Sequence, residues 1–233
     1  MKKYILFGAL SVLAVSLFAA DSTPKDDVTN AAKKLGDSAS YTWRATVVVP
    51  EDAQFKPGPI DGKTEKGGLT YVKLSFGDNT TEFVKKGESA AVTNPDGDWQ
   101  SLTNLDSSEG PGRFMVNIVR NFKTPDAQAA QLAANTKDLK KDGDVYSSDL
   151  TEDGAKAILT FGGRRGNGPN ITNPSGSVKF WVKDGTLTKY EFKVKGTVSF
   201  NGNDMDVDRD TTVEIKDVGT TKMDAPDAAK KLL

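Results

Sequence analysis

The chain has 233 residues, with 31 basic and 32 acidic side chains and neither cysteine nor histidine. The missing residue types exclude disulfides, thiol nucleophiles, Ser-His-Asp triads and the usual zinc and haem ligands. The near-balanced charge, without a basic block, argues against nucleic acid as a partner. We therefore expect no cofactor, no metal site, and a binding or structural protein rather than an enzyme.

The first twenty residues have the layout of a secretory signal peptide. Lys2 and Lys3 precede an apolar run from Tyr4 to Phe18, and small residues follow. We expect cleavage near Ala20; the alternative is a retained anchor, but about 15 apolar residues fall short of the roughly 20 that a membrane span needs. Residues 21–233 would then form a single mildly acidic domain, periplasmic or secreted. Without a cysteine to carry a lipid, we expect it to be soluble, and the sequence sets no oligomeric state.

The predicted elements begin with a short amphipathic helix in 26–37, which ends at Gly36. A half-buried strand follows in 40–49 and stops at Pro50, because its alternate residues are apolar: Tyr41, Trp43, Ala45, Val47 and Val49. Residues 51–68 are typical of a loop. The stretch 68–102 predicts a meander of antiparallel strands, with turns at 77–79 and 94–98.

The apolar spacing then changes to that of a helix. Four residues after the breaker at 109–112 recur at helical intervals: Met115, Ile118, Val119 and Phe122. A second helix is predicted in 124–139, with Thr124 as N-cap, Pro125 in the first turn and Leu132 in its apolar stripe. A third, short helix is predicted in 151–159. These segments form a helical insertion between two sets of strands.

The last third of the chain predicts two hairpins whose register can be derived. A three-residue loop at 184–186 places Phe180 opposite Tyr190 and Val178 opposite Phe192, whereas a two-residue loop would oppose Phe180 to Lys189. The Asn201-Gly202 pair favours a type I′ turn. That turn brings three pairs together: Val198 with Met205, Lys195 with Asp208, and Lys193 with Asp210.

Four aspartates alternate along the last strand: Asp204, Asp206, Asp208 and Asp210. A calcium site is one interpretation, but it needs oxygens that converge from a loop, and strand neighbours two apart stand about 6.6 Å from each other. We interpret these aspartates as a solvated sheet face that pairs with lysines. Arg209 has the opposite parity and faces the apolar side. It lies either near the sheet edge or inside a ligand cavity, where it would meet an anionic group.

The segment Gly162–Gly168, GGRRGNG, joins two arginines to four glycines. Its amides and guanidinium groups are suited to phosphate or carboxylate, so Arg164, Arg165 and Arg209 are the candidate anion-binding residues. The alternative is an exposed loop without a ligand, because the spacing matches no phosphate-binding motif.

In order, the elements resemble the LolA-like family of lipoprotein carriers and its mycobacterial lipid-binding relatives. The resemblance covers nearly all of residues 21–233 and lies in the architecture, since no short motif carries it. It implies a mainly β (α+β) fold: a curved, unclosed antiparallel β-barrel whose concave face is covered by helices, with a cavity for acyl chains. No functional residue is transferred from the family.

The strands and helices predict one shared apolar interior, which is either a ligand cavity or a packed core. Its predicted lining is Trp43, Val47, Met115, Ile118, Val119, Phe122, Leu132, Phe180, Tyr190, Phe192, Val194 and Val198. A cavity would make the protein a carrier or sensor of lipid, lipoprotein acyl chains or another hydrophobic molecule. A filled interior would indicate a structural or interaction protein of the cell envelope, with envelope proteins as partners. A hydrolase would need two acids in a cleft about 5 to 9.5 Å apart, and no such pair stands out.

Overall fold

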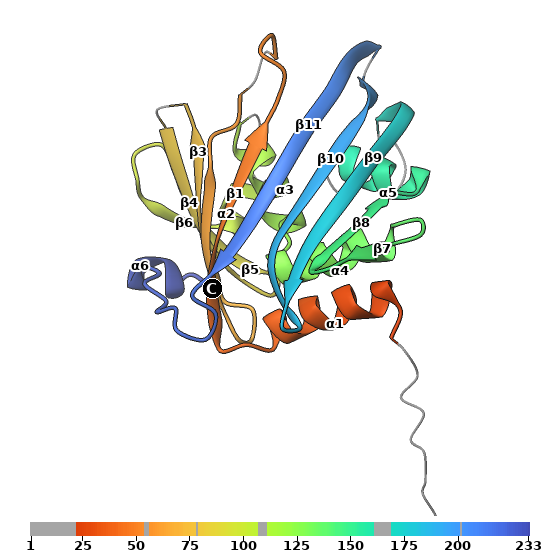
Figure 1. Cartoon of the computed structure of the whole chain (residues 1–233). Helices are drawn as coiled ribbons and strands as arrows, with labels where there is room; N and C mark the ends of the chain where they lie inside the picture. Colours follow the sequence, from red (N-terminus) through yellow and green to blue (C-terminus); the bar gives the residue numbers. More distant parts are fainter. Residues whose placement is uncertain (1–21, 54–55, 78, 107–110, 161–168, 201) are drawn as a thin grey trace, which may run out of the picture.

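The computed structural model describes residues 22–53, 56–77, 79–106, 111–160, 169–200 and 202–233 (Figure 1). In these ranges one antiparallel sheet of eleven strands has the order β6-β5-β4-β3-β2-β1-β11-β10-β9-β8-β7. The strands are β1 (Ser40–Val48), β2 (Ile60–Glu65), β3 (Thr70–Phe76), β4 (Asn79–Lys86), β5 (Ser89–Thr93), β6 (Trp99–Ser101), β7 (Lys140–Asp142), β8 (Val145–Asp149), β9 (Asn170–Lys183), β10 (Thr186–Phe200) and β11 (Asn203–Lys216). In the described chain the edge strands β6 and β7 do not pair with each other, so the sheet is open.

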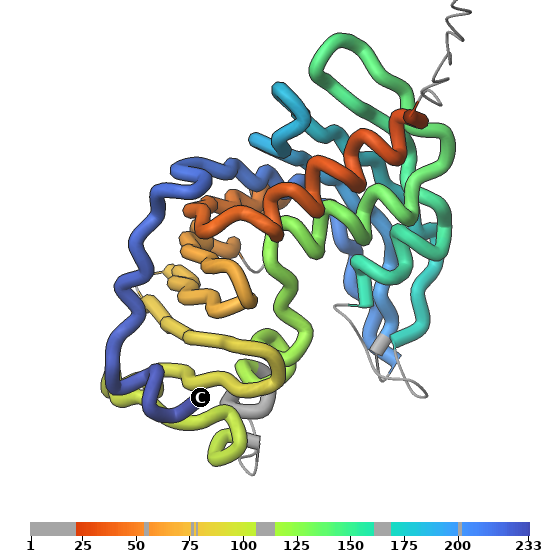
Figure 2. The backbone as a smooth tube through the Cα atoms, turned by 90° about the horizontal axis from the view of Figure 1, so that it is seen from below, coloured from red at the N-terminus to blue at the C-terminus, as the bar shows by residue number. Residues whose placement is uncertain are grey.

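Helices cover both faces of this sheet unequally. They are α1 (Pro24–Gly36), α2 (Leu102–Asp106), α3 (Pro111–Asn121), α4 (Pro125–Ala134), α5 (Glu152–Leu159) and α6 (Asp227–Lys230). Residues of α1, α3, α4 and α5 share the large hydrophobic core with one sheet face, and α6 shares a smaller cluster with the other. Figure 2 shows α1 and α4 crossing the hollow of the curved sheet side by side. The predicted fold class, an unclosed half-barrel with helices over its concave face, is confirmed.

The register of β10 against β11 is confirmed at every predicted pair. Val198 lies opposite Met205, and the lysines lie opposite the aspartates. Lys195 Nζ stands 2.7 Å from Asp208 and Lys193 Nζ stands 3.0 Å from Asp210. Within the described residues, no three acidic groups are arranged to hold a metal ion. The alternating aspartates lie on the convex face, where Asp208 and Asp210 pair with lysines and Asp204 and Asp206 accept hydrogen bonds from Ser199 and Thr197.

The turn between β9 and β10 corrects one expectation. The loop has two residues, Asp184 and Gly185, both with positive φ (52° and 68°), and not the three expected at 184–186. The predicted pairing of Phe180 with Tyr190 is nevertheless found, because an irregularity between Leu187 and Lys189 shifts the register by one residue. A β-bulge thus supplies the one-residue shift in register that the longer loop was expected to supply.

Two other expectations are wrong. The predicted loop at 51–68 contains β2, a strand with few β-forming residues that is held between β1 and β3 by pairing on both edges. The predicted helix at 124–139 ends at Ala134, and the hairpin of β7 and β8 follows. Helix α1, by contrast, begins where Thr23 and Asp26 form a reciprocal capping box, two residues before the predicted start.

Candidate functional site

The candidate site is the part of the concave interior that lies beneath α3. Trp43 projects from β1 and Phe83 from β4, while Phe122 directly follows α3. The rings of Trp43 and Phe122 stack with centroids 5.8 Å apart, and Phe83 meets Phe122 edge-on at 5.1 Å. These three residues, here called the aromatic cluster, attach the C-terminal end of α3 to the sheet.

The indole of Trp43 lies in the space left by a missing side chain. Gly62 on β2 is its cross-strand partner, so both residues face the interior. A Cβ at Gly62 would stand 2.2 Å from Cε2 and Cζ2 of Trp43. Gly62 is therefore required for the close approach of the indole ring to the backbone.

The indole nitrogen of Trp43 is a buried donor. Trp43 is 5% exposed, and no described residue places an acceptor within hydrogen-bond distance of Nε1. A buried donor without a partner costs roughly 1–3 kcal/mol. The interior thus contains a buried donor without a partner among the described residues, and it lies against the backbone of Gly62.

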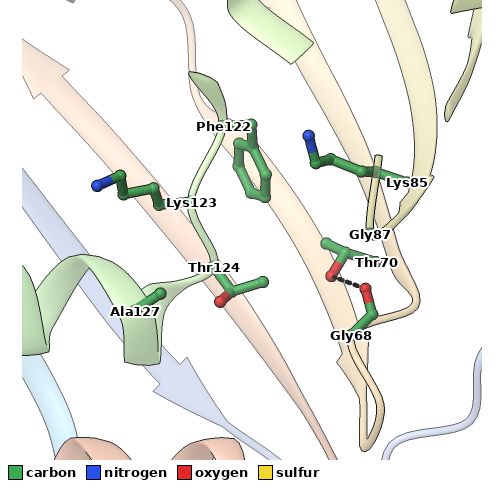
Figure 3. A pocket seen from close by; sticks show the side chains of 8 residues that line it. All are labelled: Gly68, Thr70, Lys85, Gly87, Phe122, Lys123, Thr124 and Ala127. Carbon is green, nitrogen blue, oxygen red and sulfur yellow. Dashed lines mark hydrogen bonds between the residues drawn. The ribbon is translucent and has the colours of Figure 1, made fainter. Parts of the chain in front are cut away.

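A pocket of about 310 Å³ opens beside the aromatic cluster (Figure 3). It lies between the turns that flank β3 and β4 and the connection from α3 to α4, and its lining is Gly68, Thr70, Lys85, Gly87, Phe122, Lys123, Thr124 and Ala127. Lys85 points towards Phe122, and its Nζ donates to the carbonyl oxygens of Val119 (2.9 Å) and Arg120 (3.3 Å). Burial lowers the pKa of Lys85.

The half of the interior under α1 and α4 is closed by packing and by buried hydrogen bonds. Tyr190, fully buried on β10, donates to Gln128 Oε1 of α4 at 2.7 Å. Tyr41 on β1 donates to Asp126 of α4 at 2.6 Å. Burial, together with the charge of Asp126, raises the pKa of Tyr41, so this phenol stays neutral and keeps donating. This half is a packed core.

The predicted lining residues fall into two groups. One group is buried: Trp43, Val119, Leu132, Phe180, Tyr190, Phe192, Val194 and Val198. The other is only half-buried: Val47, Met115, Ile118 and Phe122. The second group lies on α3, on the residue that follows it, and on the neighbouring strand β1, so accessible apolar surface on the predicted lining is concentrated there.

Of the predicted anion-binding arginines, the described residues include Arg209 alone. Arg209 faces the concave side as expected, where Nη2 donates to the carbonyl oxygen of Ile158 in α5 at 3.3 Å. Burial lowers the pKa of Arg209. Arg164 and Arg165 lie outside the described residues. The role of these three arginines therefore stays a prediction.

The sequence reasoning missed two residues of the site. Gly62 was assigned to a loop, and nothing in the sequence marks it as the partner of Trp43. Lys85 carried a readable signal, because it has the same strand parity as Phe83 and must point to the same face. A lysine on the apolar face of a strand is uncommon and marks a position with a special role.

A second pocket, of about 320 Å³, lies on the convex face beside Tyr71 and Asp224. Its charged groups are already joined in pairs: Arg44 stands 2.8 Å from Asp61, and Lys63 stands 2.7 Å from Asp224. Exposed pairs of this kind contribute little and leave few groups for a ligand. We therefore place the candidate site on the concave side.

No family model and no curated protein matches the sequence. Among solved structures, LprF from Mycobacterium bovis is 12% identical, with 88% of this chain and 97% of that chain covered and a TM-score of 0.48. The Mycobacterium tuberculosis lipoprotein LppX is 10% identical, with 86% and 97% covered and a TM-score of 0.47. A DUF1329 family protein from Desulfovibrio piger is 10% identical, with 91% and 100% covered and a TM-score of 0.37. At TM-scores below 0.5, function has to be inferred from the residues of this chain.

Proposed function

We propose that this protein is an exported, soluble and non-enzymatic carrier or sensor, which binds a lipid, a lipoprotein acyl chain or another hydrophobic molecule between the sheet and α3. One observation carries the proposal. Helix α3 buries Val116 and Val119 in the core, whereas three further apolar side chains of α3 and the residue after it pack against the core but stay half-buried: Met115, Ile118 and Phe122. A flexible apolar ligand would complete their burial.

The unequal cover of the concave face supports this location. Helix α5 lies directly on β9 and β10, where Leu159 Cδ1 would be 2.7 Å from a Cβ at Gly196. Helix α3 approaches the strands less closely than α5 does, and it shares the core with them through side chains that include Val116 and Val119. We therefore propose that the ligand enters beneath α3 and not beneath α5.

The energetics are favourable for an acyl chain. Each buried methylene contributes about 0.8 kcal/mol, so a chain of a dozen carbons gains roughly 10 kcal/mol before the costs of ordering are subtracted.

The alternative is a non-enzymatic structural or interaction protein of the cell envelope with a filled interior. The fully buried residues beneath α1 and α4, such as Phe180 and Tyr190, favour it for that half of the molecule. It would apply to the whole protein if α3 proved unable to admit any apolar probe.

Export belongs to the proposal. The signal-peptide segment lies outside the described residues, and among the described helices none has both the length and the apolar character needed to span a membrane. Mass spectrometry of the protein from an extracytoplasmic fraction should show an N-terminus near residue 21, and an intact Met1 in that fraction would count against cleavage.

Binding is tested by purification without detergent, organic extraction, native mass spectrometry and a fluorescent fatty-acid displacement titration. Ile118→Trp should reduce uptake by filling the space beneath α3. Asn117→Trp is the matched control, because Asn117 is exposed on the same helix. If neither lipid nor probe binds at tens of micromolar, the filled structural protein replaces the carrier. If both variants bind as the original chain does, the ligand does not lie under α3.

A further inference from the structure

We infer that the ligand is a single-chain amphiphile with an anionic head group, and that Lys85 binds that head in the pocket beside Phe122. This inference rests on the proposed function, since it names the ligand class for the same site. It adds a specific contact that a purely apolar ligand would not use.

The pocket and the interior beneath α3 share one wall. Phe122 lines the pocket, and the same ring stacks on Trp43 and meets Phe83 inside the core. A molecule whose head occupies the pocket can therefore place its chain beyond this ring, under α3. The pocket volume of about 310 Å³ accommodates a carboxylate or phosphate head and the first part of a chain.

Lys85 is the cation suited to hold such a head. It is half-buried and forms no ion pair among the described residues, although the charge of Glu88 favours its protonated form and that of Arg120 opposes it. Its two acceptors are backbone carbonyl oxygens at the C-terminal end of α3, which carry only partial negative charge. An ammonium has three donors, so one remains for a ligand oxygen. An anion would also offset the burial that disfavours the charged ammonium.

The remaining walls leave room for the head group. Gly68 and Gly87 have positive φ (84° and 59°), and a Cβ at either position would meet nothing within 4 Å. Thr124 precedes α4 without a side-chain capping bond, so its hydroxyl can donate to an anion. The mouth of the pocket is thus open, with a hydroxyl donor on its rim.

Lys123 provides a matched comparison. It also lines the pocket, but its side chain points away from Phe122, and its Nζ donates to Gln131 Oε1 at 2.7 Å (Figure 3). A general attraction of anions to a basic rim would involve both lysines. A defined head-group contact would involve Lys85 alone.

The test compares three probes of equal chain length on the mature protein: dodecanoate, dodecyl phosphate and the uncharged dodecanol. Their dissociation constants are measured by displacement of a neutral fluorescent probe at pH 8. We expect at least one anion to bind tenfold or more tightly than dodecanol, since a charge-assisted hydrogen bond is worth about one such factor or more. The preferred anion assigns the head as a carboxylate or a phosphate.

Lys85→Met should remove the preference for the anion while dodecanol binds as before. Lys123→Met should change neither, and Lys85→Arg should keep the preference. The unchanged binding of dodecanol shows that the variant still folds. If Lys85→Met does not fold, two measurements remain as the test. They are the ratio of the dissociation constants of dodecanol and the anion in the wild type, and the same ratio in Lys85→Arg.

The outcomes separate this inference from the proposed function. If dodecanol and the anions bind equally to the wild type, or if the preference survives in Lys85→Met, the inference is overturned and the carrier remains. If Lys123→Met lowers anion binding as much as Lys85→Met does, the effect is a general attraction to basic charge, which also overturns the inference. If none of the three probes binds, the proposed function itself fails.

Discussion

Replacing Gly62 by alanine should destabilise the protein through a single contact. The new Cβ would stand 2.2 Å from Cε2 and Cζ2 of Trp43, against about 3.4 Å for ordinary van der Waals contact, so the indole must shift by more than an ångström. Overpacking of this kind costs about 1–3 kcal/mol, whereas the loss of backbone freedom in the unfolded chain returns about 0.4–1 kcal/mol. We expect a net loss of about 1–2 kcal/mol, or a fall in Tm of roughly 2–8 °C for a domain of this size.

The assay is urea unfolding followed by circular dichroism, combined with a double-mutant cycle with Trp43→Phe. The smaller ring gives the new methyl group room, so Gly62→Ala should cost at least 1 kcal/mol less in that background, by the coupling expected of residues in contact. Trp43 stacks on Phe122, so its fluorescence emission should also change in Gly62→Ala. A neutral Gly62→Ala variant, or a penalty that Trp43→Phe does not relieve, would refute the placement of the indole over Gly62.

Three further predictions concern charged and titrating groups. The substitutions Asp206→Asn and Asp208→Asn should change the free energy of unfolding by less than about 0.5 kcal/mol. A rise in Tm on addition of calcium, seen only when these aspartates are present, would contradict the surface interpretation. Hydrogen bonds from Ser22 and other neighbours lower the pKa of Asp27, so its stabilisation is present above the unfolded pKa of about 4 and is lost as the pH falls through the folded pKa. Asp27→Asn should flatten that part of the urea-derived stability profile, and an unchanged profile would refute its role. Burial raises the pKa of Tyr71 to about 12; its stabilisation is complete below about pH 10 and is lost as the pH rises through 12. Tyr71→Phe should remove an ultraviolet titration step near pH 12. If all phenols of the wild type titrate near pH 10, the raised pKa of Tyr71 is excluded.

Strand registers were predictable where a turn signal and the alternation of apolar and charged residues agree on one pairing. The Asn201-Gly202 signal fixed the β10–β11 hairpin, because only one register places lysines opposite aspartates and apolar residues opposite apolar residues. The pairing of Phe180 with Tyr190 was predicted for the same reason, although the structure reaches it through a two-residue turn and a bulge. Side-chain faces constrain the register, and several local backbone paths satisfy it.

Elements held by their neighbours were not predictable in the same way. Strand β2 has a loop-like sequence and is a strand because β1 and β3 pair with both of its edges. Gly62 became part of the site only through that pairing, which places it under Trp43. The parity of Lys85 was available from the sequence, but its contact with the end of α3 requires helix and sheet to be packed together.

The sequence by itself determined the alternation of faces, the main hairpins and the amphipathic helices, because these depend on residues close together along the chain. Only the tertiary structure decided how completely each part of the concave face is covered. The hydrogen bonds of Tyr41 and Tyr190 hold α4 against one half of the face and close it, whereas α3 buries Val116 and Val119 but leaves Met115 and Ile118 half-buried. Burial depends on the distance between a helix and a sheet, and that distance is set by side chains far apart in the sequence.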